Sequence, residues 1–443
     1  MLDVVILAAG MGTRMKSNLP KVLHPVAGRP MISEVLATAK TLNPLSCVIV
    51  IGHGADRVRE TVGEAALFAF QAQRLGTGHA VMQARAALEK SGAQTVLVLY
   101  GDTPLTQAET LQRAIAHHEE HKAAVTLLSF LPDDSTGYGR IIRNEGGVVT
   151  GIVEHKDATP EQREIQESNS GIMLFDGPWL WENLDNVTLS PQGEYYLTDM
   201  PGIAVAQGRR VEGLIVDERE VMGVNNRVQL AEASQQLWAR RREKSMLSGV
   251  AIIDPTAVWI DADVTIGRDT IIHPNVVLRG KTTIGANCEI GPHAVLENAT
   301  LADHCRVNQS QIVDSTLAEG VSVGPFAVIR GDSVLEERVH VGAGAEINRS
   351  HLGPDSMMSH FGYLGDATLG ARVNVGAGTI TCNYDGKQKQ ATKIGNDVLL
   401  GSDTLLIAPV TLGHHAQTGA GAVVTHDVPP EQTVIGIPAR RKK

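Results

Sequence analysis

Apolar and polar positions follow a different rhythm in the two halves of the chain. In the first half, short apolar runs alternate with longer amphipathic segments. The apolar runs predict buried strands at Val4–Leu7, Cys47–Ile51, Leu67–Phe70, Thr95–Tyr100 and Ala124–Phe130. Helices are expected between them, over Met31–Thr41, Gly78–Lys90 and Thr106–His121. Strands that alternate with helices indicate a three-layer α/β domain with a parallel sheet, and such sheets bind ligands beyond the carboxyl ends of their strands.

The second half changes to a period of six. Aliphatic residues recur at every sixth position, often followed by glycine, and a helical period of 3.6 cannot produce this spacing. Three registers carry it: Ile260, Ile266, Ile272, Leu278, Ile284, Ile290 and Leu296; then Leu317, Val323, Ile329, Leu335, Val341 and Ile347; then Ile394, Leu400, Leu406, Leu412, Thr418 and Val424. A repeated hexapeptide predicts a parallel β-helix with one continuous core. The polar interruption Cys382–Lys393 is expected to project from the coil as a loop.

A helix is expected to link the two halves over Asn226–Ser248. Its apolar positions have helical spacing, at Leu230, Ala233 and Leu237. The basic run Arg240–Lys244 follows, and we interpret it as a solvated face of the helix, with an anion site as the alternative. The predicted division of the chain is a first domain over 1–227, a linker helix over 228–248 and a β-helix domain over 249–443.

The composition of the chain argues against several classes of binding partner. The chain has 443 residues and a net charge of −10, so a nucleic-acid polymer or an anionic membrane is not expected as a partner, whereas a small phosphorylated substrate is compatible. The four cysteines form no CxxC pair, which gives no support to a zinc or disulfide framework. No apolar stretch approaches the roughly 18 residues of a membrane span, and the start of the sequence lacks the pattern of a signal peptide. We therefore expect a cytoplasmic protein.

Candidate chemistry begins directly after the first strand. The turn Gly10–Ser17 fails as a Walker A loop and as a dinucleotide fingerprint, because Met15 stands where each pattern requires glycine. Two glycines together with Arg14, Lys16 and Lys21 still have the parts of a phosphate cradle, and an ordinary tight turn is the alternative.

Asp102 follows the strand Thr95–Tyr100. A carboxylate at the carboxyl end of a parallel strand is well placed to hold Mg²⁺ against substrate phosphates. The position is equally compatible with a helix N-cap.

Longer motifs carry a resemblance to a known family. The opening Leu7–Met15, with Leu19-Pro20-Lys21 after it, resembles that of nucleoside-diphosphate-sugar pyrophosphorylases. The match continues through Gln71, Leu75–His79, Tyr138–Arg140, Glu154, Asn169, Gly193–Asp199, Gly223–Arg227, Tyr363–Ala367 and Thr381–Gly386. Taken together, the chain resembles the bacterial bifunctional N-acetylglucosamine-1-phosphate uridylyltransferase / glucosamine-1-phosphate N-acetyltransferase family. The resemblance implies a Rossmann-like nucleotidyltransferase domain with a mostly parallel sheet, a linking helix and a left-handed parallel β-helix.

For the first domain, the resemblance implies that the phosphate of N-acetylglucosamine-1-phosphate attacks UTP and releases pyrophosphate. Asp102 and Asn225 would hold Mg²⁺, while Arg14 and Lys21 would stabilise charge on the phosphates. The UTP and UDP-sugar contacts implied by the resemblance are Leu7, Ala8, Ala9, Gly10, Lys21, Gln71, Gly76, Thr77, Tyr100, Gly101, Asp102, Gly139, Glu154, Asn169 and Asn225.

For the second domain, the resemblance implies acetyl transfer from acetyl-CoA, as co-substrate, to glucosamine-1-phosphate. The product would feed the first domain, and the final UDP-N-acetylglucosamine would serve peptidoglycan and lipopolysaccharide synthesis. The resemblance selects His360 as the general base, whereas the residues alone leave the choice among several histidines open. It implies Arg330, Tyr363 and Asn374 for the sugar phosphate and Ala377, Asn383, Tyr384, Ser402 and Ala420 for acetyl-CoA. The family builds this site between the subunits of a homotrimer.

Two positions depart from the family pattern. Asn348 stands where a lysine is expected and Ile437 where an arginine is expected, and Arg349 or Lys389 could compensate. These departures keep open an alternative in which the β-helix is a trimerising scaffold or acylates a different acceptor. A third hypothesis, a non-catalytic sugar-nucleotide sensor, is disfavoured by the intact Asp102, Asn225, Arg14 and Lys21.

Overall fold

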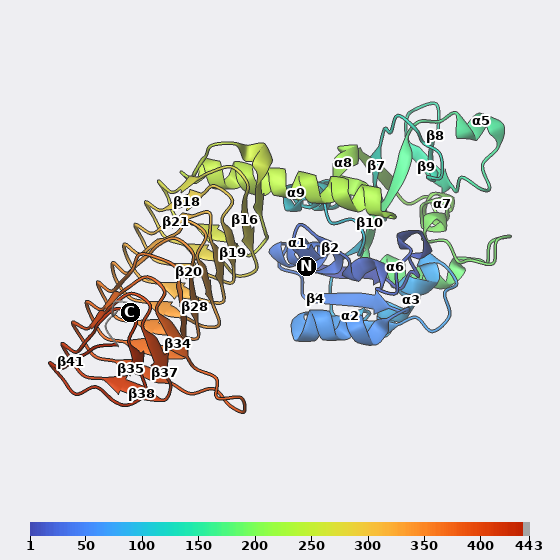
Figure 1. Ribbon diagram of the computed structural model, residues 1–443. Coiled ribbons are helices and arrows are strands. Elements are labelled where there is room, and N and C mark those ends of the chain that lie inside the picture. Colours follow the sequence, from blue (N-terminus) through green and yellow to red (C-terminus); the bar gives the residue numbers. More distant parts are fainter. Residues whose placement is uncertain (437–443) are drawn as a thin grey trace. The chain divides into compact units, whose positions relative to one another are not determined.

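The computed structural model describes residues 1–436, which divide into two compact units (Figure 1). The division falls within helix α9 (Arg227–Leu247), between Leu237 and Trp238. None of the helices in the described residues combines the length and the apolar character that a membrane crossing requires.

The first unit is built on one nine-stranded sheet. Its strands are β1 (Leu2–Ala8), β4 (Ser46–Ile51), β5 (Leu67–Phe70), β6 (Thr95–Tyr100), β7 (Val125–Phe130), β8 (Arg140–Arg143), β9 (Val149–Val153), β10 (Ser168–Asp176) and β11 (Val211–Ile215), while β2 (Pro25–Val26) and β3 (Arg29–Pro30) form a separate ribbon. The main path runs β11-β7-β10-β6-β1-β4-β5 and is parallel except for β10, which runs antiparallel to β6 and β7. The five predicted strands and the mostly parallel sheet are confirmed.

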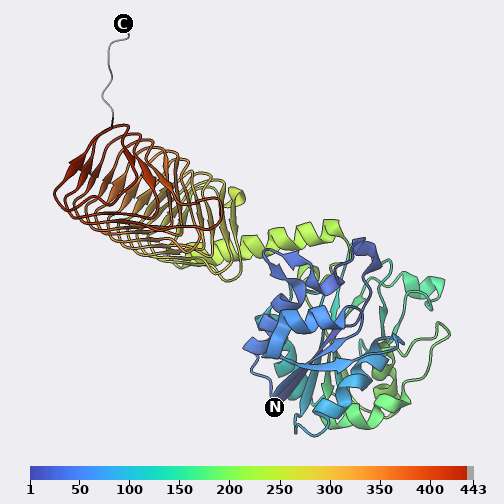
Figure 2. The same cartoon turned by 60° about the horizontal axis from the view of Figure 1, so that its bottom comes forward.

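Helices cover both faces of this sheet (Figure 2). The helices that lie wholly in this unit are α1 (Met31–Thr41), α2 (Ala55–Val62), α3 (Thr77–Leu88), α4 (Ala108–His121), α5 (Pro160–Arg163), α6 (Gly177–Asn183), α7 (Met200–Ala206) and α8 (Glu218–Val221). Residues of α3, α6 and α7 belong to the buried cluster on one face, and residues of α1, α2 and α4 to that on the other. Successive strand residues point to opposite faces. Accordingly Val5 and Leu7 belong to one buried cluster, whereas Val4 and Ile6 belong to another. The predicted three layers are confirmed, and the three predicted helices differ from α1, α3 and α4 by at most two residues at either end.

The second unit is a left-handed parallel β-helix, in which short strands stack into three sheets (Figure 1). The first sheet contains β12 (Ala251–Ile252), β15 (Ile271–Ile272), β18 (Glu289–Gly291), β21 (Arg306–Asn308), β24 (Ser322–Val323), β27 (His340–Val341), β30 (Met357–Met358), β33 (Asn374–Val375), β36 (Leu399–Leu400), β39 (Gln417–Thr418) and β41 (Thr433–Val434). The second contains β13 (Val258–Ile260), β16 (Val276–Arg279), β19 (Val295–Glu297), β22 (Gln311–Val313), β25 (Val328–Arg330), β28 (Ala345–Asn348), β31 (Gly362–Gly365), β34 (Ile380–Cys382), β37 (Leu405–Ile407) and β40 (Val423–Val424). The third contains β14 (Thr265–Ile266), β17 (Thr283–Ile284), β20 (Thr300–Leu301), β23 (Thr316–Leu317), β26 (Val334–Leu335), β29 (His351–Leu352), β32 (Ala367–Leu369), β35 (Thr392–Ile394) and β38 (Val410–Leu412).

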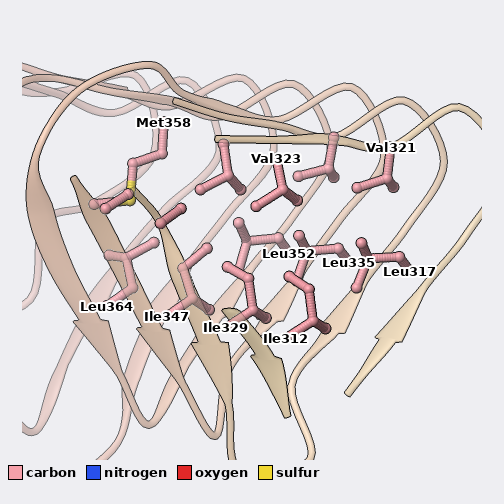
Figure 3. Close-up of a cluster of buried hydrophobic side chains, with 14 of the residues drawn as sticks. Ile312, Leu317, Val321, Val323, Ile329, Leu335, Ile347, Leu352, Met358 and Leu364 are labelled. Atoms are coloured by element: carbon pink, nitrogen blue, oxygen red, sulfur yellow. The ribbon is translucent and has the colours of Figure 1, made fainter. Parts of the chain in front are cut away.

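The predicted aliphatic registers belong to one continuous column that fills the coil (Figure 3). Between Leu296 and Leu317 the column continues through Leu301, Val307 and Ile312, which are all buried. Several of these steps are five residues long, so the period of six is lost in the sequence while the stacking is kept. Ile290, for example, pairs with Val307. The loop after Cys382 is also present, and the next strand begins at Thr392.

The basic run of the linker helix is only partly a solvated face. Arg242 is 8% exposed, so the expectation of a solvated side chain is wrong at this position. Its guanidinium donates to the carbonyl oxygen of Val258 at 2.9 Å, and Arg241 donates to that of Ile260 at 3.4 Å. Both carbonyls belong to β13, an edge strand whose one pairing partner within residues 1–436 is β16. The arginines therefore bind backbone acceptors of the first coil that no earlier strand could bind.

Candidate functional site

The candidate site of the first unit lies beyond the carboxyl ends of β1 and β6. These strands are parallel neighbours, and Leu7 pairs with Tyr100 at their ends. The amide of Gly101 then donates to the carbonyl oxygen of Leu7 at 2.9 Å. The glycine-rich turn that follows β1 and the carboxylate that follows β6 therefore meet at one edge of the sheet, as ligand sites of such sheets do.

Gly12 and Met15 fix the shape of the turn. Gly12 has a φ of +63°, and a Cβ there would lie 2.4 Å from the Cβ of Lys21. Only glycine lets Lys21 approach this closely. Met15, which breaks both nucleotide-binding patterns, is 1% exposed and anchors the turn in the unit.

Lys21 contacts two oxygen atoms at the centre of the site. Its Nζ forms an ion pair with the Oδ2 of Asp102 and donates to the Oδ1 of Asn225 at 2.6 Å. The Nη2 of Arg14 donates to the same Asn225 oxygen at 2.8 Å. The amide of Val224 donates to the carbonyl oxygen of Asp102 at 2.8 Å, which sets Asn225 beside it. The N-cap interpretation of Asp102 is wrong, because α4 begins only at Ala108.

The same two oxygen atoms fit a divalent cation. A single positively charged nitrogen touches both the Asp102 and the Asn225 side chains, so both oxygens face one cation position. Carboxylate and amide oxygens are ligands that Mg²⁺ accepts, with further positions left for phosphate and water. The donor set and its placement therefore suit Mg²⁺, with the Lys21 ammonium standing where the metal charge would act.

A cavity of about 370 Å³ opens over this centre. Its volume lies in the range of roughly 300–1,000 Å³ that small-molecule sites occupy. Twelve of the nominated residues line it: Leu7, Ala8, Ala9, Gly10, Arg14, Lys21, Gln71, Gly76, Thr77, Tyr100, Asp102 and Asn225. The lining also includes Arg74 and Glu194, which sequence reasoning did not nominate although each lies in or beside a quoted motif.

The three residues nominated for the sugar lie together. The amide of Asn169 donates to the carbonyl oxygen of Gly139 at 2.8 Å, and a Cβ on Gly139 would lie 3.6 Å from the Oε2 of Glu154. Tyr100 ends β6, two residues before Asp102, and lines the same cavity. Burial, and then the carboxylates of Glu154 and Asp102, raise the pKa of Tyr100, so its phenol remains protonated.

Sequence reasoning missed His79. The Nε2 of the buried Gln71 lies 3.0 Å from the Nδ1 of His79 and 3.1 Å from the carbonyl oxygen of Gly76, to which it donates. These contacts fix the orientation of the Gln71 amide beside the cavity. His79 ends the quoted run Leu75–His79, so its place in that motif was the available signal.

In the second unit, four nominated residues form one column at a corner of the coil. Strand pairing aligns Met357 with Asn374, Asn374 with Leu399, and Leu399 with Gln417. Three residues after each of these positions come His360, Ala377, Ser402 and Ala420, which therefore stack on successive coils. We call them the corner column; His360 is its exposed first member and the other three are small.

A second group of nominated residues lies around Gly365. The Nδ2 of Asn383 contacts the Oδ2 of Asp366 at 2.5 Å, and a Cβ on Gly365 would meet both this nitrogen and the hydroxyl of Tyr363. Arg349 forms a two-pronged ion pair with Asp366, at 2.7 and 3.0 Å. Arg330 lies on the same sheet, where it pairs with Glu346 at 2.6 Å.

Of the two positions that depart from the family pattern, 348 and 437, the structure describes the first. Asn348 is buried, and its Oδ1 accepts from the Nη1 of Arg349 at 3.0 Å. The position thus carries no cation of its own, but it orients the guanidinium next to it. Ile437 lies outside the described residues. A cavity of about 480 Å³ includes Tyr363 in its lining but not His360 or Asn374, so this cavity does not gather all the nominated residues.

Comparison with known proteins follows the same two-part division. Residues 4–136 match the family described as MobA-like NTP transferase domain, and residues 253–361 match the family described as GMPPB C-terminal domain. The Bifunctional protein GlmU of Brevibacillus brevis is 45% identical over 436 residues, which are 98% of this chain and 94% of that protein. The protein of the same name from Heliobacterium modesticaldum is 47% identical over 431 residues, 96% of this chain and 93% of its own. The protein of the same name from Stutzerimonas stutzeri is 47% identical over 439 residues, which are 98% of this chain and 96% of that protein.

Two alanine substitutions in the turn should separate folding from binding. Gly10 lines the cavity, and a Cβ there would meet nothing within 4 Å. Gly10→Ala should therefore leave the melting temperature unchanged and weaken nucleotide binding, because the new methyl group enters the space of the ligand. Gly12→Ala should lower the melting temperature as well, by strain at positive φ and by collision with Lys21.

Thermal unfolding and calorimetric titration with UTP measure the two effects. Gly151→Ala is the matched control, since it lies outside the cavity lining and also has open space around it. If Gly10→Ala binds UTP as tightly as the unchanged protein does, the nucleotide does not lie against this turn.

Proposed function

The chain belongs to the family of bifunctional GlmU proteins, and on this premise we propose how its two units share the work. Membership confirms the resemblance seen in the sequence and makes the chain an enzyme with two transferase activities. The first unit is the uridylyltransferase and the β-helix is the acetyltransferase. The observation that carries the proposal for the first unit is the contact of Asp102 and Asn225 with the same ammonium group, that of Lys21.

In the first unit, we assign UTP to the 370 Å³ cavity. Gln71, held by Gly76 and His79, would bind the base, and the turn at Gly10 would pass along the phosphates. Gly139, Glu154 and Asn169 would hold N-acetylglucosamine-1-phosphate, with the Tyr100 phenol between sugar and nucleotide. The two substrates would then lie on either side of Asp102.

The reaction needs positioning and charge neutralisation more than covalent catalysis. A phosphate oxygen of the sugar phosphate bonds to the α-phosphorus of UTP, the bond from that phosphorus to the bridging oxygen breaks, and pyrophosphate leaves with the negative charge. Lys21 and Arg14 reach this centre and would stabilise the charge on the transferred and leaving groups. Asp102 and Asn225 would hold Mg²⁺, which when bound supplies additional positive charge to the phosphates.

In the second unit, we assign acetyl transfer to the corner column and its surroundings. The Nε2 or Nδ1 of His360 would take a proton from the ammonium group of glucosamine-1-phosphate, so that the amine can attack the thioester carbonyl and coenzyme A leaves as the thiol. Ala377, Ser402 and Ala420 would leave space along the corner for acetyl-CoA, with Asn383 and Tyr384 at its side. Arg330, Tyr363 and Asn374 would bind the sugar phosphate, and Arg349 would supply the positive charge that Asn348 lacks.

Two further features of the proposal concern assembly and location. Phe326 and Phe361 are 67% and 61% exposed, both lie at the corner of the β-helix, and Phe361 follows His360 directly. Exposed aromatic side chains next to an incomplete site support closure by another copy of the chain, and we propose a homotrimer.

A cytoplasmic location, where UTP and acetyl-CoA are available, stays a prediction.

Light scattering on the full-length protein should give a mass of three chains. Phe361→Glu should lower that mass and reduce acetyl transfer while uridylyl transfer persists, because only the second site would depend on the contact between copies. A monomeric unchanged protein with full acetyl transfer would contradict the trimeric site.

Crossed substitutions test the division of labour. Asp102→Ala should abolish pyrophosphate release from UTP and N-acetylglucosamine-1-phosphate and leave acetyl transfer nearly unchanged. His360→Ala should lower acetyl transfer by roughly 10²–10⁴-fold, the usual contribution of a general base, and spare uridylyl transfer. Both activities are measured on each variant, with saturating substrates.

His340→Ala is the matched control, since the Nδ1 of His340 is 2.8 Å from the Oγ of Ser322 and its ring lies one coil before the His360 corner. It should retain acetyl transfer. Acetyl transfer that survives His360→Ala and fails in His340→Ala would move the base to His340. Loss of both activities in folded Asp102→Ala would contradict two independent sites.

A further inference from the structure

A cluster of three ligand-type side chains lies in the first unit, away from the residues assigned to uridylyl transfer. His117 and His121 stand four residues apart near the end of α4, and Glu212 lies on β11, an edge strand of the sheet. One nitrogen or oxygen atom of each lies within 4.8 Å of those of the others. Within residues 1–436 it is the one group of three or more histidine, cysteine, aspartate and glutamate side chains gathered this closely.

The distance between ligand atoms in the cluster is close to the distance between the ligands of a bound metal ion. The Nε2 of His117 lies 3.1 Å from the Oε2 of Glu212. Tetrahedral ligand atoms at bond lengths of about 2.0–2.2 Å stand about 3.4 Å apart, so a small adjustment would admit an ion between them. The two imidazole rings lie one turn apart, with centroids at 4.1 Å. Two histidines at this helical spacing on one face are a recurrent way to bind Zn²⁺.

Neighbouring groups hold the ligands ready. The Nδ1 of His121 lies 2.9 Å from the carbonyl oxygen of His117 and can donate to it, which leaves the Nε2 of His121 with its lone pair. A hydrogen bond of this kind on the other ring nitrogen is typical of metal-binding histidines. Arg210 donates to the Oε1 of Glu212 at 2.5 Å, so the Oε2 is the oxygen turned toward the histidines.

Charge around the cluster is compatible with a cation. Arg210, which is paired with Glu212, contacts its Oε1 and not the Oε2 that faces His117. The positive charge of Arg143 also acts on Glu212, but Arg143 is paired with Glu167 at 2.7 Å. The His117 and Glu212 side chains are 27% and 20% exposed, so water can supply a fourth ligand.

We propose that His117, His121 and Glu212 form a site for a divalent transition-metal ion of the zinc class. Imidazole and carboxylate together suit Zn²⁺ and its neighbours, whereas Mg²⁺ prefers oxygen ligands alone. The bound ion joins the end of α4 to the edge strand β11. Because the three ligands come together only in the folded unit, binding stabilises that unit.

The competing explanation is a plain histidine–carboxylate pair that fastens α4 to β11. The chain offers a matched control for it. His351 contacts Glu336 at 2.6 Å in the β-helix, also as a half-exposed pair, and belongs to no such group of three. His351→Gln should therefore leave metal binding unchanged.

The experiment uses the full-length protein, stripped of metal with a chelator and titrated with Zn²⁺ by calorimetry in excess Mg²⁺. We expect one Zn²⁺ per chain at this site, and binding more than about tenfold weaker in His121→Gln and Glu212→Gln, because changes even outside the first ligand shell typically cost 10–100-fold. Zn²⁺ should raise the melting temperature of the unchanged protein and of His351→Gln, but not of His121→Gln.

Co²⁺ gives a readout that does not depend on stability. Its visible absorption bands should have the intensity of a tetrahedral nitrogen–oxygen site in the unchanged protein and lose it in both ligand variants. The proposal is overturned if the unchanged protein binds no Zn²⁺. It is equally overturned if His121→Gln and Glu212→Gln bind Zn²⁺ as tightly as His351→Gln does.

Discussion

The contact of Lys21 with Asp102 and Asn225 organises the first site. Lys21 follows the turn after β1, Asp102 follows the end of β6, and Asn225 lies in the segment before α9, so one ammonium group holds together segments far apart in the sequence. The pair of Lys21 and Asp102 is largely shielded from solvent, at 12% and 20% exposure. Removal of one partner would leave a poorly solvated charge, which costs more than the pair itself contributes. The same need for close approach explains why the turn requires glycine at position 12.

The second site depends on stacking in a comparable way. Nearly every coil adds one apolar residue per sheet to the core, with Thr381 and Thr418 as buried exceptions. Steps of five or six residues are both accepted because the turn absorbs the difference. The strands therefore keep their register through many coils, and positions three residues beyond paired strands coincide at the corner. His360 and the three small residues after it in the corner column owe their alignment to this register and not to contacts among themselves.

Much of this could be predicted from the sequence. Buried strands such as Thr95–Tyr100 are continuous apolar runs, and the six-residue spacing reports directly on the coil. The antiparallel β10 was not predicted, because strand direction depends on the connection and not on the residues of the strand. Arg242 was misjudged since a basic run gives no sign of carbonyl acceptors that arrive from another segment. The tie between His79 and Gln71 and the cluster of His117, His121 and Glu212 likewise join residues whose proximity only the folded chain creates.

The central claim is that the Lys21 ammonium acts on the same two oxygens that would hold the metal. Binding of Mn²⁺, followed by electron paramagnetic resonance in the absence of nucleotide, tests this most directly when the unchanged protein is compared with Lys21→Met. The unit charge of an ammonium and the double charge of Mn²⁺ about 4 Å apart repel by roughly 2–8 kcal/mol at effective dielectric constants between water and protein surface. The account predicts Mn²⁺ binding at least about tenfold tighter in Lys21→Met, with uridylyl transfer lost. Equal Mn²⁺ affinity in the two proteins would contradict it.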